Sequence, residues 1–152
     1  MTRTTVSPLE SHLGYWLRFV SNHVSHAFAR KVEAHGVTVA EWVVLRELYD
    51  RDGLAPSILA ERIGMTRGAI TKIADRLIAK DLVIRQAVEA DRRFQTLALT
   101  AAGRRLVPAL ARLADTNDAE FFAHLSKAER AALTAAMKAI VKLHGLKAVP
   151  LD

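Results

Sequence analysis

The residues between positions 66 and 76 can contact a polyanion along one side of a helix. Three cations recur at intervals of four and five residues, with two threonines and a glycine among them: Thr66, Arg67, Gly68, Thr71, Lys72 and Arg76. Arginine and lysine bind phosphate oxygens, arginine can also bind guanine through two hydrogen bonds, and threonine hydroxyls can donate to either. Gly68 lacks a side chain and allows a close approach near the helix start, where backbone N–H groups favour a phosphate. We expect these six residues to contact DNA.

A second basic group follows at positions 92 and 93. Arg92 and Arg93 stand in a polar stretch between two short apolar runs, and Asp91 is close enough to orient one of them by a charge-assisted hydrogen bond. Arginine in a narrow minor groove is a common means of recognising DNA shape. An ordinary solvated surface is the alternative for both basic groups. For Arg85, a phosphate contact and an ion pair are both compatible with the sequence.

Two short helices must position the first basic group. Pro56 opens the first helix and Gly64 ends it, and the second begins after Thr66. The first helix carries the apolar residues Ile58, Leu59 and Ile63, and the second carries Ile70, Ile73, Ala74, Leu77 and Ile78. Packing the second set inward turns the basic residues outward. This is a helix-turn-helix pattern, whose second helix enters the major groove.

The rest of the chain supplies four more helices and a hairpin. Apolar periodicity predicts helices over 9–34, 38–48 and 101–125, and a final helix that a capping box at Ser126 and Glu129 opens and whose inner side includes His144. Residues 82–88 and 95–100 predict two strands, with 89–93 as a charged tip and Asp81 in a left-handed turn before them. The expected fold is mainly α (α+β), a winged helix-turn-helix with long terminal helices, in the order α-α-α-α-β-β-α-α.

Composition limits the classes of function. The chain has 152 residues, no cysteine and a formal net charge of +6, of which half lies in residues 66–95, with seven Lys or Arg against four Asp or Glu. Thiol chemistry is therefore excluded, and a basic balance favours polyanionic partners. No signal peptide or membrane span is visible, so we expect a cytoplasmic protein. His23 and His26 lack neighbouring metal ligands, so neither a metal nor a cofactor is expected.

The central motifs resemble the MarR (multiple antibiotic resistance regulator) family. They are LAERIGMTR at 59–67, ITKIADRL at 70–77, DRR at 91–93 and LALTAAG at 97–103. The resemblance implies a homodimeric transcription regulator with dimerisation helices in 1–36 and 104–152 and a DNA-binding region in 37–103. It also implies a palindromic operator of double-stranded DNA and repression that a small aromatic or anionic ligand relieves. Ala55 and Asp81 depart from the family pattern at a helix cap and a turn.

In this family a ligand cleft lies beside the first two long helices. Six residues there can line a cleft for a phenolic carboxylate: Trp16, Phe19, His23, Trp42, Leu45 and Arg46. Packing in the core or at a dimer interface is the alternative for each of them. The first and last helices both carry apolar stripes that the small winged region cannot cover alone, which favours a dimer.

Other classes of function fit less well. The sequence contains no Gly-rich phosphate loop, nucleophile elbow or paired metal motif, so we expect no enzyme. A winged-helix module that binds another protein without an operator is an alternative, and so is a regulator that responds to no ligand.

Overall fold

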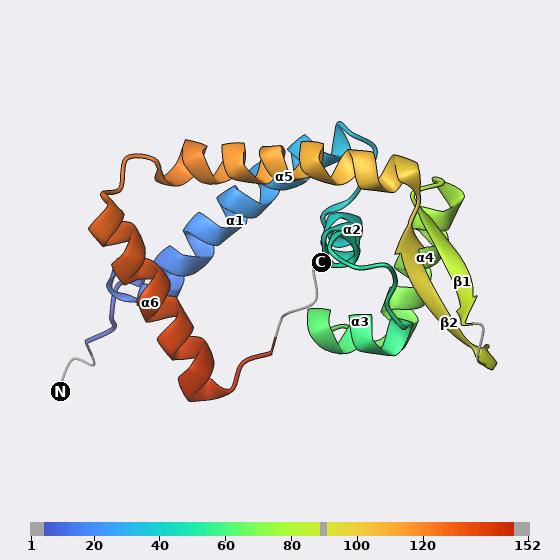
Figure 1. Ribbon diagram of the computed structural model, residues 1–152. Helices are drawn as coiled ribbons and strands as arrows, with labels where there is room; N and C mark the ends of the chain where they lie inside the picture. Colours follow the sequence, from blue (N-terminus) through green and yellow to red (C-terminus); the bar gives the residue numbers. More distant parts are fainter. Residues whose placement is uncertain (1–4, 89–90, 148–152) are drawn as a thin grey trace.

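The computed structural model describes residues 5–88 and 91–147 of the chain (Figure 1). Its elements are a 3-10 turn η1 (Leu9–Ser11), α1 (Leu13–Glu33), α2 (Val39–Tyr49), α3 (Pro56–Ile63), α4 (Arg67–Ala79), β1 (Val83–Val88), β2 (Asp91–Leu99), α5 (Ala101–Phe122) and α6 (Lys127–His144). This order confirms the mainly α winged helix-turn-helix predicted from the sequence, with η1 as an addition. No described helix is long and apolar enough to cross a membrane.

The molecule has a winged-helix part and a part made of long helices (Figure 1). Helices α2, α3 and α4 and the hairpin gather at one end of α5, and α6 turns back from the other end. Helix α1 packs along α5. Asn117 of α5 holds this contact, because its side chain donates to the Val24 carbonyl of α1 at 3.1 Å and accepts from Lys31 of α1 at 2.9 Å.

The hydrophobic core lies in the winged-helix part and reaches the near ends of α1 and α5. Its large, fully buried apolar side chains come from seven elements: Val32, Val44, Leu45, Leu48, Leu59, Ile70, Leu77, Val83, Leu97, Val107 and Leu110. Leu59 and Ile63 of α3 are buried, whereas Ile58 of the same helix is about half exposed, because the short α3 buries only one side. The core therefore fixes α4 and leaves α6 and much of α1 outside.

The hairpin differs from the prediction at its tip. Val83 pairs with Leu99 and the register runs regularly to Ala87, after which it shifts and Val88 pairs with Asp91. Strand β2 therefore begins at Asp91, so the backbone of 91–93 belongs to a strand and the predicted polar tip shortens. Cross-strand hydrogen bonding extends a strand through polar residues, which an apolar pattern cannot indicate.

The ends of the long helices also differ from the prediction. The first helix was expected over 9–34 but is interrupted at His12, whose extended backbone separates η1 from α1. The indole nitrogen of Trp16 donates to the carbonyl of Glu10 at 2.9 Å, which ties η1 to α1. Helix α5 ends at Phe122, and Pro108 lies inside it.

Two backbone features bring α5 to the hairpin. Asp81 adopts the predicted left-handed conformation, with φ of 58°, and directs the chain from α4 into β1. Gly103 in the first turn of α5 lies against this connection, and a Cβ added there would be 2.2 Å from the carbonyl oxygen of Leu82. Only glycine fits this approach, so Gly103 sets the distance between α5 and the base of the hairpin.

Candidate nucleic-acid interface

Helix α4 is fixed at its start by a tight turn and a side-chain cap. Gly64 ends α3 in the left-handed conformation, with φ of 81°, and Thr66 caps α4 by accepting a hydrogen bond from the amide of Ala69 at 3.1 Å. The inner side of α4 then packs into the core through Ile70, Ile73, Ala74 and Leu77. This is the arrangement that the sequence predicts for a helix-turn-helix.

The opposite side of α4 is open to solvent. Every residue singled out on this helix as a DNA contact is exposed, and so is one acidic neighbour: Thr66, Arg67, Gly68, Thr71, Lys72, Arg76 and Asp75. A Cβ added at Gly68 would meet nothing nearer than the hydroxyl of Thr66 at 4.0 Å. The helix start therefore offers open backbone to an approaching group. We call this set of seven residues the outer face of α4.

The two threonines on the outer face differ in what their hydroxyls can offer. The Thr71 hydroxyl donates to the carbonyl of Arg67 at 2.9 Å, so its oxygen is left to accept a hydrogen bond. The Thr66 oxygen accepts from Ala69, so its hydrogen is left to donate. In this geometry Thr66 suits a phosphate oxygen, and Thr71 must rotate its hydroxyl before it can donate to one.

The hairpin is joined to α4 by an ion pair. Arg85 of β1 donates to Asp75 of α4 at 2.5 Å, so the ion pair, one of the two alternatives for Arg85, forms in the protomer, and its phosphate contact stays a prediction. The backbone of Arg92 and Arg93 lies in β2, and their side chains fall outside the described residues. The sequence did not predict the role of Asp75, because its partner is ten residues away on another element.

The six proposed ligand-cleft residues do not form one site within the protomer. Phe19 stacks on His23 and contacts Trp16 along α1, and these three side chains are exposed. Trp42 of α2 meets Phe28 instead, which lies about 13 Å further along α1 than Phe19 at 1.5 Å per residue.

The other two candidates on α2 are also separate. Leu45 is wholly buried in the core, so it packs within the protomer and does not line an open cleft. Arg46 is on the surface, where it pairs with Asp50 at 2.8 Å and lies over the ring of Tyr49. The hydrogen bond and negative charge of Asp50 raise the pKa of the Arg46 guanidinium. Arg46 is therefore a permanent cation that already has an acidic partner.

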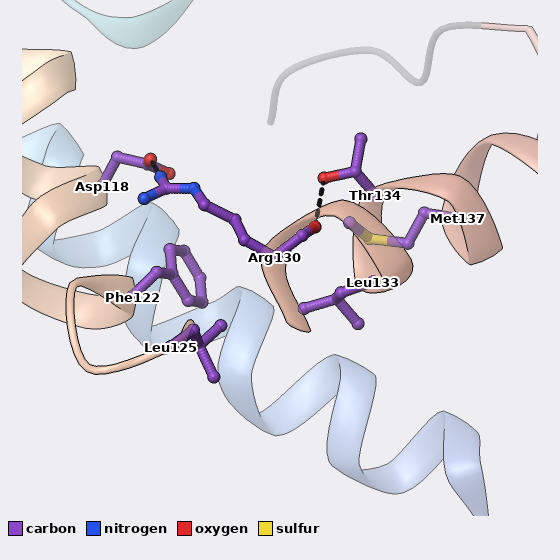
Figure 2. A pocket seen from close by; sticks show the side chains of 7 residues that line it. All are labelled: Asp118, Phe122, Leu125, Arg130, Leu133, Thr134 and Met137. Carbon is purple, nitrogen blue, oxygen red and sulfur yellow. Dashed lines mark hydrogen bonds and ion pairs between the residues drawn. The ribbon is translucent and has the colours of Figure 1, made fainter. Parts of the chain in front are cut away.

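A small cavity lies at the elbow between α5 and α6, and none of the six proposed ligand-cleft residues lines it (Figure 2). It has a volume of about 250 Å³ and is lined by Asp118, Phe122, Leu125, Arg130, Leu133, Thr134 and Met137. An ion pair between Asp118 and Arg130 joins the two helices beside it. In the part of the chain that the structure describes, no group of three or more His, Cys, Asp or Glu residues could hold a metal ion.

Comparison with known proteins places these features in a family. A family model described as the MarR family matches residues 35–93, from the corner before α2 to the start of β2. A candidate transcriptional regulator of the hcr operon from Thauera aromatica is 32% identical over 138 residues, covering 88% of this chain and 81% of that protein. The transcriptional repressor MdtR of Bacillus subtilis is 34% identical over 95 residues, covering 62% of this chain and 61% of its own.

The fold also matches a solved structure. Bordetella bronchiseptica BpsR, whose DNA binding is regulated by 6-hydroxynicotinic acid, superposes with a TM-score of 0.78 at 24% identity. The match covers 90% of this chain and 97% of that one. The two chains therefore share the same arrangement of the winged-helix part and the long helices.

Proposed function

Because the chain belongs to the MarR family of transcriptional regulators, we propose that it is a homodimeric repressor that binds a palindromic DNA operator and is released by a small aromatic or anionic ligand. Members of this family are transcriptional regulators and not enzymes. The observation that carries the proposal is the two-sided nature of α4, which has an apolar side in the core and a basic side in solvent.

We assign DNA contact to the outer face of α4 and to the hairpin. Arg67, Lys72 and Arg76 supply charge, and an arginine on this face can bind guanine. Thr66, Gly68 and Thr71 support contacts near the helix start. Arg92 and Arg93 on the hairpin are assigned to the minor groove on the sequence argument alone.

We assign dimerisation to segments 1–36 and 104–152. All of α6 is exposed in the protomer, including an apolar stripe of Leu133, Met137, Ile140 and Val141. Leu13, Leu17 and Val20 of α1 are exposed as well. A second copy is the simplest cover for these stripes, and it would bring two α4 helices about 34–36 Å apart, one turn of DNA. The cavity at the α5–α6 elbow shares Leu133 and Met137 with this surface, so we assign it to the interface.

We place the ligand at Trp42 and Arg46, which lie one turn apart on α2. An aromatic ring can stack near Trp42 and Phe28, and a carboxylate can displace Asp50 from Arg46. Similarity to the B. subtilis repressor MdtR supports a role in repression. The regulation of BpsR by 6-hydroxynicotinic acid supports an aromatic acid as the ligand. Trp16, Phe19 and His23 join this site only if a partner subunit brings them there.

A binding-site selection from random-sequence DNA at fixed salt tests the DNA-binding proposal. Arg67→Ala should lose about 1–3 kcal/mol of binding free energy and relax one position of the selected site. Arg62→Ala is the matched control, because Arg62 is an exposed arginine on α3 that pairs with Glu47 and lies outside both the outer face of α4 and the dimerisation segments. If the wild-type protein selects no sequence and its binding is insensitive to salt, the protein-binding module replaces this proposal.

Tryptophan fluorescence tests the ligand proposal. Trp16→Phe leaves Trp42 as the single tryptophan, and titration with 6-hydroxynicotinic acid and related aromatic acids should change its emission. Arg46→Ala should weaken that response, and Arg51→Ala on the same surface should not. No response across the panel would favour a regulator that responds to no ligand.

A further inference from the structure

A buried carboxylate holds the end of α4, and none of the functions above uses it. Glu41 lies in the first turn of α2 and is 1% exposed. Its Oε1 atom accepts from the amide of Thr38 at 3.4 Å, as part of a capping box, and its Oε2 atom accepts from the ammonium group of Lys80 at 2.7 Å. A buried charge is tolerated only when it is paired, so this carboxylate requires Lys80.

Lys80 is the residue that ends α4. Its backbone amide donates to the carbonyl of Arg76, and its ammonium group also donates to the carbonyl of Gly36 at 2.8 Å. One side chain therefore joins the end of α4 to two points on the corner between α1 and α2. This corner is itself fixed, because Val32 and Val37 on either side of Gly36 are buried in the core.

We propose that Glu41 and Lys80 are positioning residues that set the direction of α4 against the α1–α2 corner, and so fix the spacing between the half-sites that a dimer recognises. The part of this inference that is tested with DNA rests on the proposed function. Lys80 is one of the seven cations in residues 66–95, but its ammonium group faces this corner and not the outer face of α4.

The length of α4 makes the spacing sensitive to this contact. The helix has 13 residues and is about 20 Å long. A tilt of roughly 5° about its Lys80 end moves the other end, where Arg67 lies, by about 1.7 Å, and the same tilt in both subunits changes their separation by about 3.4 Å. That is the rise of one base pair. A small change at the corner therefore alters which half-site spacing fits.

The test uses duplexes built from the site that wild-type protein selects, with the centre kept, lengthened or shortened by one base pair. We expect wild-type protein to prefer its own spacing by about tenfold or more. Lys80→Met keeps the aliphatic stem and removes the charge, and it should reduce this preference to below about threefold. Glu41→Gln should have the same effect, and Lys80→Arg should restore the preference.

Lys72→Met is the matched control, since Lys72 is an exposed lysine on the outer face of the same helix. It should weaken binding to all three duplexes equally and make the salt slope shallower by about two, because each subunit of the dimer loses one phosphate contact. If Lys80→Met behaves in this way, Lys80 is a phosphate contact and the positioning role is refuted. An unchanged spacing preference in both Lys80→Met and Glu41→Gln also refutes it.

A measurement without DNA separates this inference from the proposed function. The chain has no cysteine, so Arg67→Cys can be spin-labelled at one site in each subunit. Pulsed electron resonance then gives the distance between the two α4 helices in a dimer. Lys80→Met should broaden or shift this distribution even if no operator is found, and an unchanged distribution would refute the positioning role. A dimer that shows the broadening but binds no DNA would refute only the proposed function.

Discussion

Replacing two apolar residues of α6 should dissociate the dimer. Most residues of α6 are small or charged, but Met137 and Ile140 are large and apolar. They are 43% and 41% exposed in the protomer. Met137→Ser with Ile140→Ser removes the centre of the apolar stripe. Because α6 has no buried residue, the double variant should keep the winged-helix core intact.

The size of the effect follows from the exposed fractions. Fully burying a methionine or isoleucine side chain contributes about 1.5–3 kcal/mol, so burying the remaining two fifths contributes roughly 0.6–1.3 kcal/mol. A symmetric dimer contains four such side chains, and the double variant therefore loses about 2.5–5 kcal/mol of association free energy. At 1.4 kcal/mol per factor of ten, the dissociation constant should rise by about one hundred to several thousand times.

Sedimentation equilibrium over a range of protein concentrations measures this constant directly, and far-ultraviolet circular dichroism checks that the helices remain. Ile58→Ser is the matched control, because Ile58 is 48% exposed on α3, outside the proposed interface. It should leave the dissociation constant unchanged. If the α6 variant associates as tightly as wild-type protein, or if Ile58→Ser weakens association equally, the stripe on α6 is not the dimer interface.

Three further changes test contacts within the protomer. Gly103→Ala places a Cβ 2.2 Å from a backbone oxygen and should lower the free energy of unfolding by about 1–3 kcal/mol in urea, while Gly14→Ala, with open space around it, should not. Arg85→Ala should weaken DNA binding in fluorescence anisotropy, because it leaves the Asp75 carboxylate unpaired beside the phosphates, and adding Asp75→Asn should restore binding. Hydrogen bonds from Ser126 lower the pKa of Glu129, so Glu129→Gln should weaken α6 in hydrogen exchange at pH 7.

The direction of the Glu129 pKa shift determines the pH range in which Glu129→Gln weakens α6. A carboxyl group whose pKa is lower in the folded protein stabilises that state above its ordinary pKa, and this contribution is lost as the pH falls through the folded value. The difference between wild-type protein and Glu129→Gln should therefore disappear in acid. A difference that grows in acid would contradict the capping role.

The other two changes have their own contradictory results. For Gly103→Ala, this would be a free energy of unfolding equal to that of wild-type protein. For Arg85→Ala, it would be DNA binding that does not recover when Asp75→Asn is added.

Local signals in the sequence predicted most of the fold. Thr66 and the pair Ser126 and Glu129 cap their helices as expected, because a cap depends on residues within three positions of one another. The apolar stripe of α4 was also correct, since it follows from helical periodicity alone. Asp81 took the left-handed turn because aspartate tolerates that conformation without a glycine.

The features that the sequence did not reveal depend on partners far along the chain. In the sequence, Glu41 looks like an ordinary helix-capping residue. Its buried carboxylate is paired with Lys80, which is 39 positions away. Leu45 and Arg46 are neighbours in sequence, but the rotation of 100° per residue sends one into the core and the other to the surface. The start of β2 at Asp91 likewise depends on its pairing with β1.

These long-range contacts change the electrostatics expected for DNA binding. The structure describes the side chains of five of the seven cations in residues 66–95, and two of these, Lys80 and Arg85, are held by carboxylates of the protein. With Arg92 and Arg93 assigned to DNA from the sequence, five cations in each subunit are assigned to phosphates. A dimer using all five in both subunits neutralises about ten phosphates, and the logarithm of the binding constant should fall with that of salt concentration with a slope near −9. Counting all seven would give about −13. A measured slope clearly steeper than −9 would show that Lys80 or Arg85 leaves its ion pair when DNA binds, and Lys80→Met and Arg85→Ala would identify which one does.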